Sequence, residues 1–133
     1  MKFLLDTDTC IFWLRGHASV HNRLTAAGPE EVGLSVITLA ELRYGAACSA
    51  QSGANHQAID DFSSALSVFG VDLDIAHAFG DIKAQLRRDG MPIEDFDLLV
   101  AATARTYDLT LVTNNTDHFS RISGLRLENW VQP

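Results

Sequence analysis

Residues 2–15, KFLLDTDTCIFWLR, contain the pattern that decides the fold. They open with a short apolar run that an aspartate ends, which is typical of a buried strand in a parallel sheet. Thr7 or Asp8 can cap a helix that continues to about Arg15, where Gly16 can end it. Further strands are predicted at residues 32–36, 68–73, 109–113 and 125–128.

Helical periodicity separates these predicted strands. It covers residues 17–27, 38–50, 56–66, 74–89 and 94–107. Strands that alternate with helices of about ten to fifteen residues predict an α/β fold, a three-layer sandwich with a central parallel β-sheet flanked by helices. No linker, repeat or charged block interrupts the pattern, so we expect a single domain over residues 1–133.

Composition narrows the class of protein. The chain has 133 residues, of which 47% are hydrophobic and 20% charged, values typical of a folded globular domain. Its formal net charge is −7, which argues against a general nucleic-acid binder because phosphate contacts need clustered Lys and Arg. An enzyme that meets phosphate through a metal ion, or an acidic site matched by a basic partner, remains compatible with this charge.

The cysteines and the N-terminal segment indicate a cytoplasmic protein. Cys10 and Cys48 lie outside any CxxC or Cys/His cluster, so we expect buried free thiols in a reducing compartment. Asp6 and Asp8 interrupt the apolar N-terminal stretch, which therefore does not resemble a signal peptide. The apolar runs are also far shorter than the ~20 residues of a membrane span.

Acidic and amide side chains follow several of the predicted strands. In an open α/β sheet, ligands bind beyond the carboxyl ends of the strands. Carboxylates from separate segments would repel one another there unless a cation neutralised them, and hard oxygen ligands select Mg²⁺ or Mn²⁺. The candidates are Asp6, Asp8, Glu41, Asp97, Asn114, Asn115 and Asp117.

Each of these residues also has a purely structural interpretation. Thr38 and Glu41 have the T-x-x-E spacing of a capping box, which spacing alone favours for Glu41. Asp8 can be only a helix cap, and Asp6 only part of a turn. Asp97 can complement a helix dipole, as can its acidic neighbours.

Four segments resemble a known family. LLDTDTCIFWL, SVITLAELRYGA, MPIEDFDLLVAATA and LVTNNTDHFSRISGLRLENW are similar to PIN-domain ribonucleases of the VapC type, the toxins of type II toxin–antitoxin pairs. The similarity runs nearly from end to end, with the motifs in the same order and spacing. The implied fold is a small parallel α/β sandwich, in agreement with the strand and helix pattern.

The resemblance implies particular site residues. The family's metal-binding carboxylates fall on Asp6, Glu41 and Asp97, so Glu41 is expected to be more than a helix cap. A fourth acid often follows the fourth strand; here Asn114 and Asn115 stand in that region, and Asp117 is the nearest carboxylate. Possible auxiliary residues are therefore Asp8, Asn115 and Asp117. For His118, the nearest histidine in sequence, we expect a surface or structural role.

The resemblance also implies an activity and partners. The expected activity is that of a Mg²⁺-dependent endoribonuclease, with Mn²⁺ as an alternative ion, which cuts tRNA, the initiator tRNA in its anticodon region in particular. The expected partners are a VapB-type antitoxin, a second copy of the chain in a homodimer, and operator DNA through the antitoxin complex. The apolar stretch at residues 11–14 is a candidate for the antitoxin groove.

Three other functions are compatible with parts of the sequence. A PIN fold with a decayed site would be a binding module without catalysis. LLDTDT also resembles the DxDxT opening of haloacid-dehalogenase-type phosphatases, in which Asp6 would be a nucleophile and Asp8 a general acid. A response-regulator receiver domain fits the length but needs a lysine at its last strand, and the lysines are Lys2 and Lys83.

Overall fold

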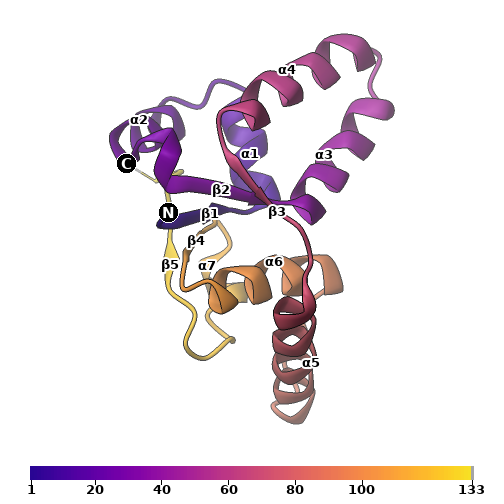
Figure 1. Cartoon of the computed structure of the whole chain (residues 1–133), viewed down its shortest axis with the longest axis vertical. Coiled ribbons are helices and arrows are strands. Elements are labelled where there is room, and N and C mark those ends of the chain that lie inside the picture. The colour runs from indigo at the N-terminus through magenta and orange to yellow at the C-terminus, as the bar shows by residue number, and fades with distance from the viewer. Residues whose placement is uncertain (133) are drawn as a thin grey trace.

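A five-stranded parallel sheet forms the centre of the molecule (Figure 1). The computed structural model describes residues 1–132. In spatial order the strands are β3 (Ser67–Phe69), β2 (Val32–Ser35), β1 (Phe3–Leu5), β4 (Thr110–Val112) and β5 (Leu127–Glu128). The predicted all-parallel sheet is therefore confirmed.

The strand order places a switch point beside β1. From β1 the chain first builds outward through β2 and β3, and it then returns to the other side of β1 to form β4 and β5. Leu5 at the end of β1 pairs with Val112 at the end of β4. Asp6 and Thr113, the next residue of each segment, are thus neighbours at the carboxyl edge, where ligands bind in open α/β sheets.

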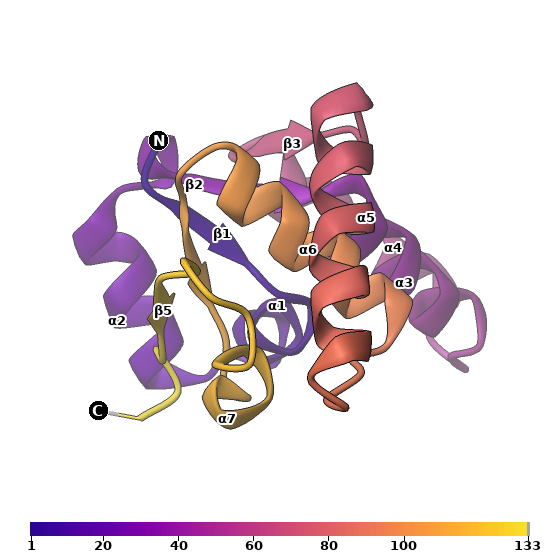
Figure 2. The ribbon, with the colours of Figure 1, turned by 90° about the horizontal axis from the view of Figure 1, so that it is seen from below.

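Helices cover both faces of the sheet (Figure 2). One core packs α5, α6 and α7 against it, around Leu4, Leu98 and Leu111. A second core packs the four remaining α-helices on the opposite face, around Leu5 and Leu34. The helices are α1 (Thr7–Leu14), α2 (Ala18–Ala27), α3 (Val36–Ala47), α4 (Ser52–Ser64), α5 (Leu73–Arg88), α6 (Asp95–Thr106) and α7 (Thr116–Phe119), with a 3₁₀ turn at Pro29–Glu31.

Several helices begin earlier in the sequence than predicted. Asp6 caps α1 in place of Thr7 or Asp8, and Asp72 caps α5 in place of Asp74. The α4 helix starts at Ser52, four residues before the predicted start at residue 56. The third strand, predicted to continue to residue 73, ends at Phe69 because Asp72 already serves as the N-cap of α5.

The capping-box interpretation of Glu41 is also wrong. Helix α3 starts directly after β2, and the Ser35 hydroxyl accepts the Ile37 backbone N–H at 3.0 Å. Thr38 is fully buried inside the first turn and is not the cap. Glu41 is therefore one turn into the helix, where its carboxylate has no role at the helix terminus.

The thiols differ from the expectation at one position. Cys10 is buried, as predicted, whereas Cys48 is exposed at the end of α3. Within residues 1–132 both are free thiols.

None of the helices in this described part of the chain is long and apolar enough to cross a membrane.

Ser35→Ala should lower the free energy of unfolding by about 1 kcal/mol, because it removes the N-cap of α3. Chemical denaturation monitored by circular dichroism measures the change. Ser64→Ala is the matched control, since its exposed hydroxyl bonds only the Asp61 carbonyl and surface changes usually stay within about 0.5 kcal/mol. Equal destabilisation by the two substitutions would contradict the assignment of Ser35 as the cap.

Candidate metal-dependent nuclease site

Asp6 is a buried residue at the carboxyl edge of the sheet. It directly follows β1 and is 6% exposed, and its Oδ1 accepts the Thr9 backbone N–H at 2.8 Å. Burial raises the pKa of Asp6, while hydrogen bonds from the Thr113 side chain and from Thr9 partly oppose that rise. The carboxylate is thus held in a fixed place by the start of α1 and by the residue that follows β4.

Glu41 reaches the same edge from α3. Its Oε1 accepts the Thr7 hydroxyl at 2.6 Å, and that hydroxyl lies 3.3 Å from the Thr38 hydroxyl. A charge-assisted bond of this length orients the carboxylate strongly. Thr38, which spacing had suggested as a cap, instead helps to hold Thr7 against Glu41.

Asp97 enters the site from the first turn of α6. Its pKa is raised to about 6, first by burial and then by the negative charges of Glu94, Glu41, Asp6 and Asp8. Like charges raise the pKa of a carboxyl group when they lie close to it. Carboxylates from three distant parts of the chain therefore converge at one edge of the sheet.

His118 is a neighbour of this cluster that the sequence did not mark as a site residue. It belongs to α7, and its Nε2 lies 3.7 Å from Asp97 Oδ2. The nitrogen is buried and has no hydrogen-bond partner among the described residues. Burial and the charge of Arg121 lower the pKa of His118, against a weaker opposing effect of Glu94.

The remaining candidates lie around this centre. Asp8 is exposed, yet its charge raises the pKa of both Asp6 and Asp97. Asn114 accepts the Asn129 side-chain amide at 3.1 Å, so it anchors the C-terminal segment. Asn115 donates its backbone N–H to the Thr113 hydroxyl, and Asp117 is an exposed residue of α7.

Sequence reasoning missed three contributors to the site besides His118. Glu94 caps α6 and exerts the largest charge effect on Asp97, whereas the sequence predicts only a helix-dipole role for the acidic neighbours of Asp97. Thr7 holds Glu41, and Thr113 bonds Asp6. The register of β1 with β4 would have indicated Thr113, because Asp6 and Thr113 follow paired residues.

The chemistry of the donor set suits a hard divalent cation. Within residues 1–132, no three His, Cys, Asp or Glu side chains are arranged to hold a metal ion as they stand. The pKa of Asp97 is instead raised, first by burial and then by the charges of nearby carboxylates that include Glu41 and Asp6. Oxygen ligands and concentrated negative charge are what Mg²⁺ and Mn²⁺ bind.

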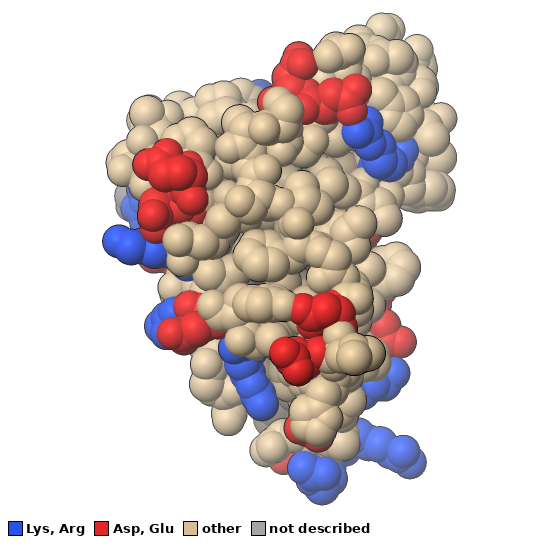
Figure 3. Space-filling view, in the orientation of Figure 1, with Lys and Arg blue, Asp and Glu red and all other residues tan. Residues whose placement is uncertain are grey.

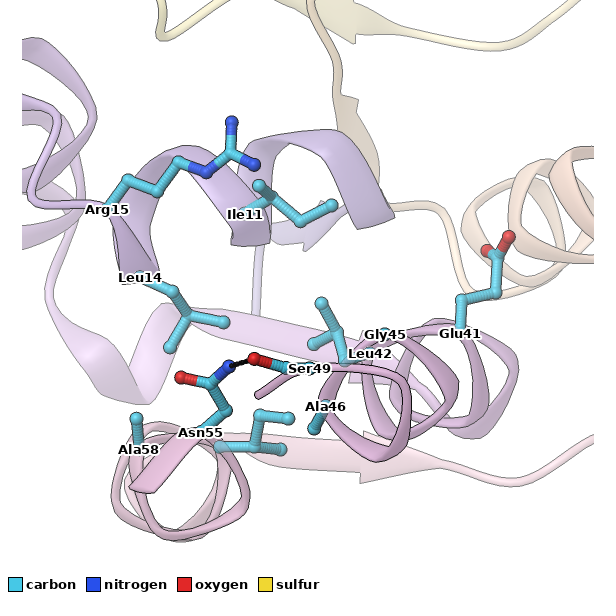
Figure 4. Close-up of a pocket in the computed structure, with 11 residues that line it drawn as sticks. Ile11, Leu14, Arg15, Glu41, Leu42, Gly45, Ala46, Ser49, Asn55 and Ala58 are labelled. Atoms are coloured by element: carbon cyan, nitrogen blue, oxygen red, sulfur yellow. Dashed lines mark hydrogen bonds between the residues drawn. The ribbon is translucent and has the colours of Figure 1, made fainter. Parts of the chain in front are cut away.

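A groove of about 370 Å³ runs away from Glu41 between α1, α3 and α4 (Figure 4). Its walls are mainly apolar and include Ile11, Leu14, Leu42 and Ile59. Part of the predicted stretch at residues 11–14 therefore does line a groove. In Figure 3 several Lys and Arg side chains lie at the lower end of the molecule, where Figure 1 places α5, whose last turn contains two arginines.

Comparisons with known proteins agree with this fold. A PIN-domain family model matches residues 3–125. The chain is 40% identical to the "tRNA(fMet)-specific endonuclease VapC" of Shigella flexneri and 37% identical to that of Salmonella typhimurium, with 98% of each chain covered. A solved structure of DNA-bound VapBC from Salmonella typhimurium superposes with a TM-score of 0.93 at 37% identity, covering 98% of both chains.

The carboxylate-lined edge of a small parallel sheet defines the general class, a PIN-like α/β domain with an acidic site. The chain belongs to the PIN-domain family and, within it, to the VapC ribonucleases. The predicted family and fold are thereby confirmed. PIN-domain nucleases generally depend on divalent metal ions.

Asp97→Asn should raise the melting temperature of the metal-free protein above pH 6. The ionised Asp97 destabilises the folded state because its pKa is about 6 there and 3.8 in the unfolded chain. The gain should shrink between pH 6 and 4 and vanish below the unfolded pKa, where both states are protonated.

Thermal denaturation of the wild type and the variant across this pH range measures the effect. Asp74→Asn, in the first turn of α5, is the matched control and should give no gain, since it loses a favourable helix-dipole interaction. An Asp97→Asn protein no more stable than the wild type at pH 8 would show that the charges do not oppose one another.

Proposed function

We propose that the protein is the toxin of a toxin–antitoxin pair and a Mg²⁺-dependent endoribonuclease. The single domain over residues 1–133 would cut tRNA, with the initiator tRNA anticodon region as the favoured target, and so inhibit translation in the cytoplasm. The observation that carries the proposal is the convergence of Asp6, Glu41 and Asp97, expressed in the raised pKa of Asp97. Similarity to tRNA(fMet)-specific endonucleases supports the choice of substrate.

Asp6 and Asp97 would hold the metal ion directly, and Glu41 would complete the site. A bound Mg²⁺ or Mn²⁺ supplies Lewis-acid polarisation of the scissile phosphate and neutralises charge that develops in the transition state. Asp6 suits this task because its backbone and side-chain bonds fix it before any ion arrives. Asp8, Asn115 and Asp117 are auxiliary candidates at the rim.

Glu41 would act as the general base for the attacking water. Its Oε1 is engaged by Thr7 at 2.6 Å, so the Thr7 hydroxyl orients the carboxylate while Oε2 takes the proton. The water oxygen forms the new bond to phosphorus, and the bond from phosphorus to the 3′ oxygen breaks. The products are a 5′-phosphate and a 3′-hydroxyl, and no side chain becomes covalently attached.

RNA would approach across local cations, because the chain is acidic as a whole. Arg15 lines the groove that begins at Glu41, and Arg121 lies near His118. In this proposal each would contact a phosphate that flanks the cut site. The metal ion and these few arginines would together replace the broad basic surface of a general RNA binder.

A VapB-type antitoxin is the proposed protein partner. Solved structures similar to this chain include DNA-bound VapBC of Salmonella typhimurium, at 37% identity, and DNA-bound VapBC2 of Rickettsia felis, at 34% identity. The apolar groove between α1, α3 and α4 fits an apolar antitoxin segment, with a basic residue meeting the acidic edge at Glu41. We further propose a homodimer, contact with operator DNA only through the antitoxin complex, and no membrane partner.

Membership of the PIN-domain family removes the phosphatase and receiver-domain alternatives. A decayed binding module would not need Glu41 and Asp6 placed where their charges raise the pKa of Asp97 at a cost in stability.

Glu41→Gln should reduce cleavage of tRNA by roughly a hundredfold or more, the scale of a lost general base. Stability should change little, because glutamine can still accept the Thr7 hydroxyl. Purified proteins assayed on tRNA with Mg²⁺, with and without EDTA, test this. Glu30→Gln, in the distant 3₁₀ turn, is the control and should retain full activity. Wild-type cleavage by Glu41→Gln, or cleavage that survives EDTA, would overturn the proposal.

Mg²⁺ or Mn²⁺ should raise the melting temperature of the isolated chain, because an ion that binds only the folded cluster stabilises it. Asp6→Ala should remove most of this gain, whereas Asp81→Ala, on the exposed face of α5, should retain it. Differential scanning calorimetry at several ion concentrations gives the comparison. Equal gains in wild type and Asp6→Ala would place the cation elsewhere.

A further inference from the structure

We propose that His118 contributes a nitrogen ligand to the metal site and shifts its preference from Mg²⁺ toward Mn²⁺. This inference rests on the proposed metal-dependent function. It starts from one contact and one unsatisfied atom: His118 Nε2 lies 3.7 Å from Asp97 Oδ2 and is buried without a hydrogen-bond partner.

The separation of the two atoms suits a shared ion better than a direct bond. A distance of 3.7 Å exceeds the range of N–H···O hydrogen bonds, which ends near 3.2 Å. Two ligands that each lie about 2.1 Å from one ion are about 3.0–3.5 Å apart at octahedral or tetrahedral angles. A small closing movement of either side chain therefore brings both to coordination distance.

The position of His118 is built into the fold. The adjacent Phe119 is 2% exposed and packs in the core beneath α5 and α6, which anchors α7. The Phe119 backbone N–H also bonds the Asn115 carbonyl at 3.3 Å. The His118 ring meets the Phe119 ring edge to face at 5.3 Å, which further restricts its orientation.

The other histidines each have a different environment. His17 caps α2, and His21 stacks on Trp13 while its Nε2 contacts the Trp13 carbonyl. His56 contacts Arg43, and His77 pairs with Asp81 on the exposed face of α5. A buried ring nitrogen without a partner is thus particular to His118 among the described histidines.

An imidazole ligand changes which ion the site prefers. Mg²⁺ favours oxygen ligands and keeps several waters, whereas imidazole nitrogen suits later and softer ions. Mn²⁺ accepts both kinds of donor. A site of carboxylates plus His118 should therefore bind Mn²⁺ with a larger advantage over Mg²⁺ than a site made of carboxylates alone.

Titration calorimetry of the full chain with MnCl₂ and with MgCl₂ tests the proposal, beside pulsed electron paramagnetic resonance of bound Mn²⁺. His118→Gln should weaken Mn²⁺ binding about tenfold or more, with a smaller loss for Mg²⁺, on the scale seen for residues that support metal ligands. The resonance signal should show coupling to a nitrogen nucleus in the wild type and lose it in the variant. His118→Glu should bind both ions with the preference moved toward Mg²⁺.

His77→Gln is the matched control, because it alters another histidine–aspartate pair away from the site. It should leave both affinities and the nitrogen coupling unchanged. An unaltered ratio of Mn²⁺ to Mg²⁺ affinity in His118→Gln, together with no nitrogen coupling in the wild type, would overturn the role of His118. A wild-type chain that binds neither ion would overturn the proposed metal-dependent function itself.

Discussion

Mutual repulsion of carboxylates at the carboxyl edge of the sheet is the constraint on which the functional architecture depends. The central strand β1 delivers Asp6 to that edge, while α3 and α6 bring Glu41 and Asp97 to it from opposite faces of the sheet. Burial and like charge oppose the ionisation of Asp97. Placing these carboxylates together lowers the free energy of unfolding, but it also creates a site that favours a divalent ion. The two well-packed cores supply the stability that offsets this loss.

Local bonds allow the site residues to stay where repulsion would displace them. Asp6 is both a carboxylate of the cluster and the N-cap of α1, so its position is stabilised by the helix that it starts. Ser35 caps α3, which leaves the Glu41 carboxylate available to Thr7. Glu41 lines one end of the apolar groove, so a partner that occupies the groove also reaches the carboxylate edge.

The sequence predicted the parallel sheet and the family because both depend on patterns that are local or nearly continuous along the chain. It failed where a tertiary contact decides between two local choices. Thr38 and Glu41 have capping-box spacing, but the N-cap of α3 is Ser35, three residues before Thr38 and at the end of a strand. Likewise, nothing in the local sequence of His118 indicates Asp97, which is twenty-one residues away and meets it only after α6 and β4 have packed.

Crystals grown with Mn²⁺ test whether the converging carboxylates form one cation site. Anomalous scattering locates the ion without reference to any assumed ligand. We expect an ion in contact with Asp6 and Asp97 at the carboxyl edge of β1, with Glu41 in contact with it or with one of its waters. Anomalous density confined to other surface carboxylates, with the β1 edge empty at saturating Mn²⁺, would show that these carboxylates do not form a cation site.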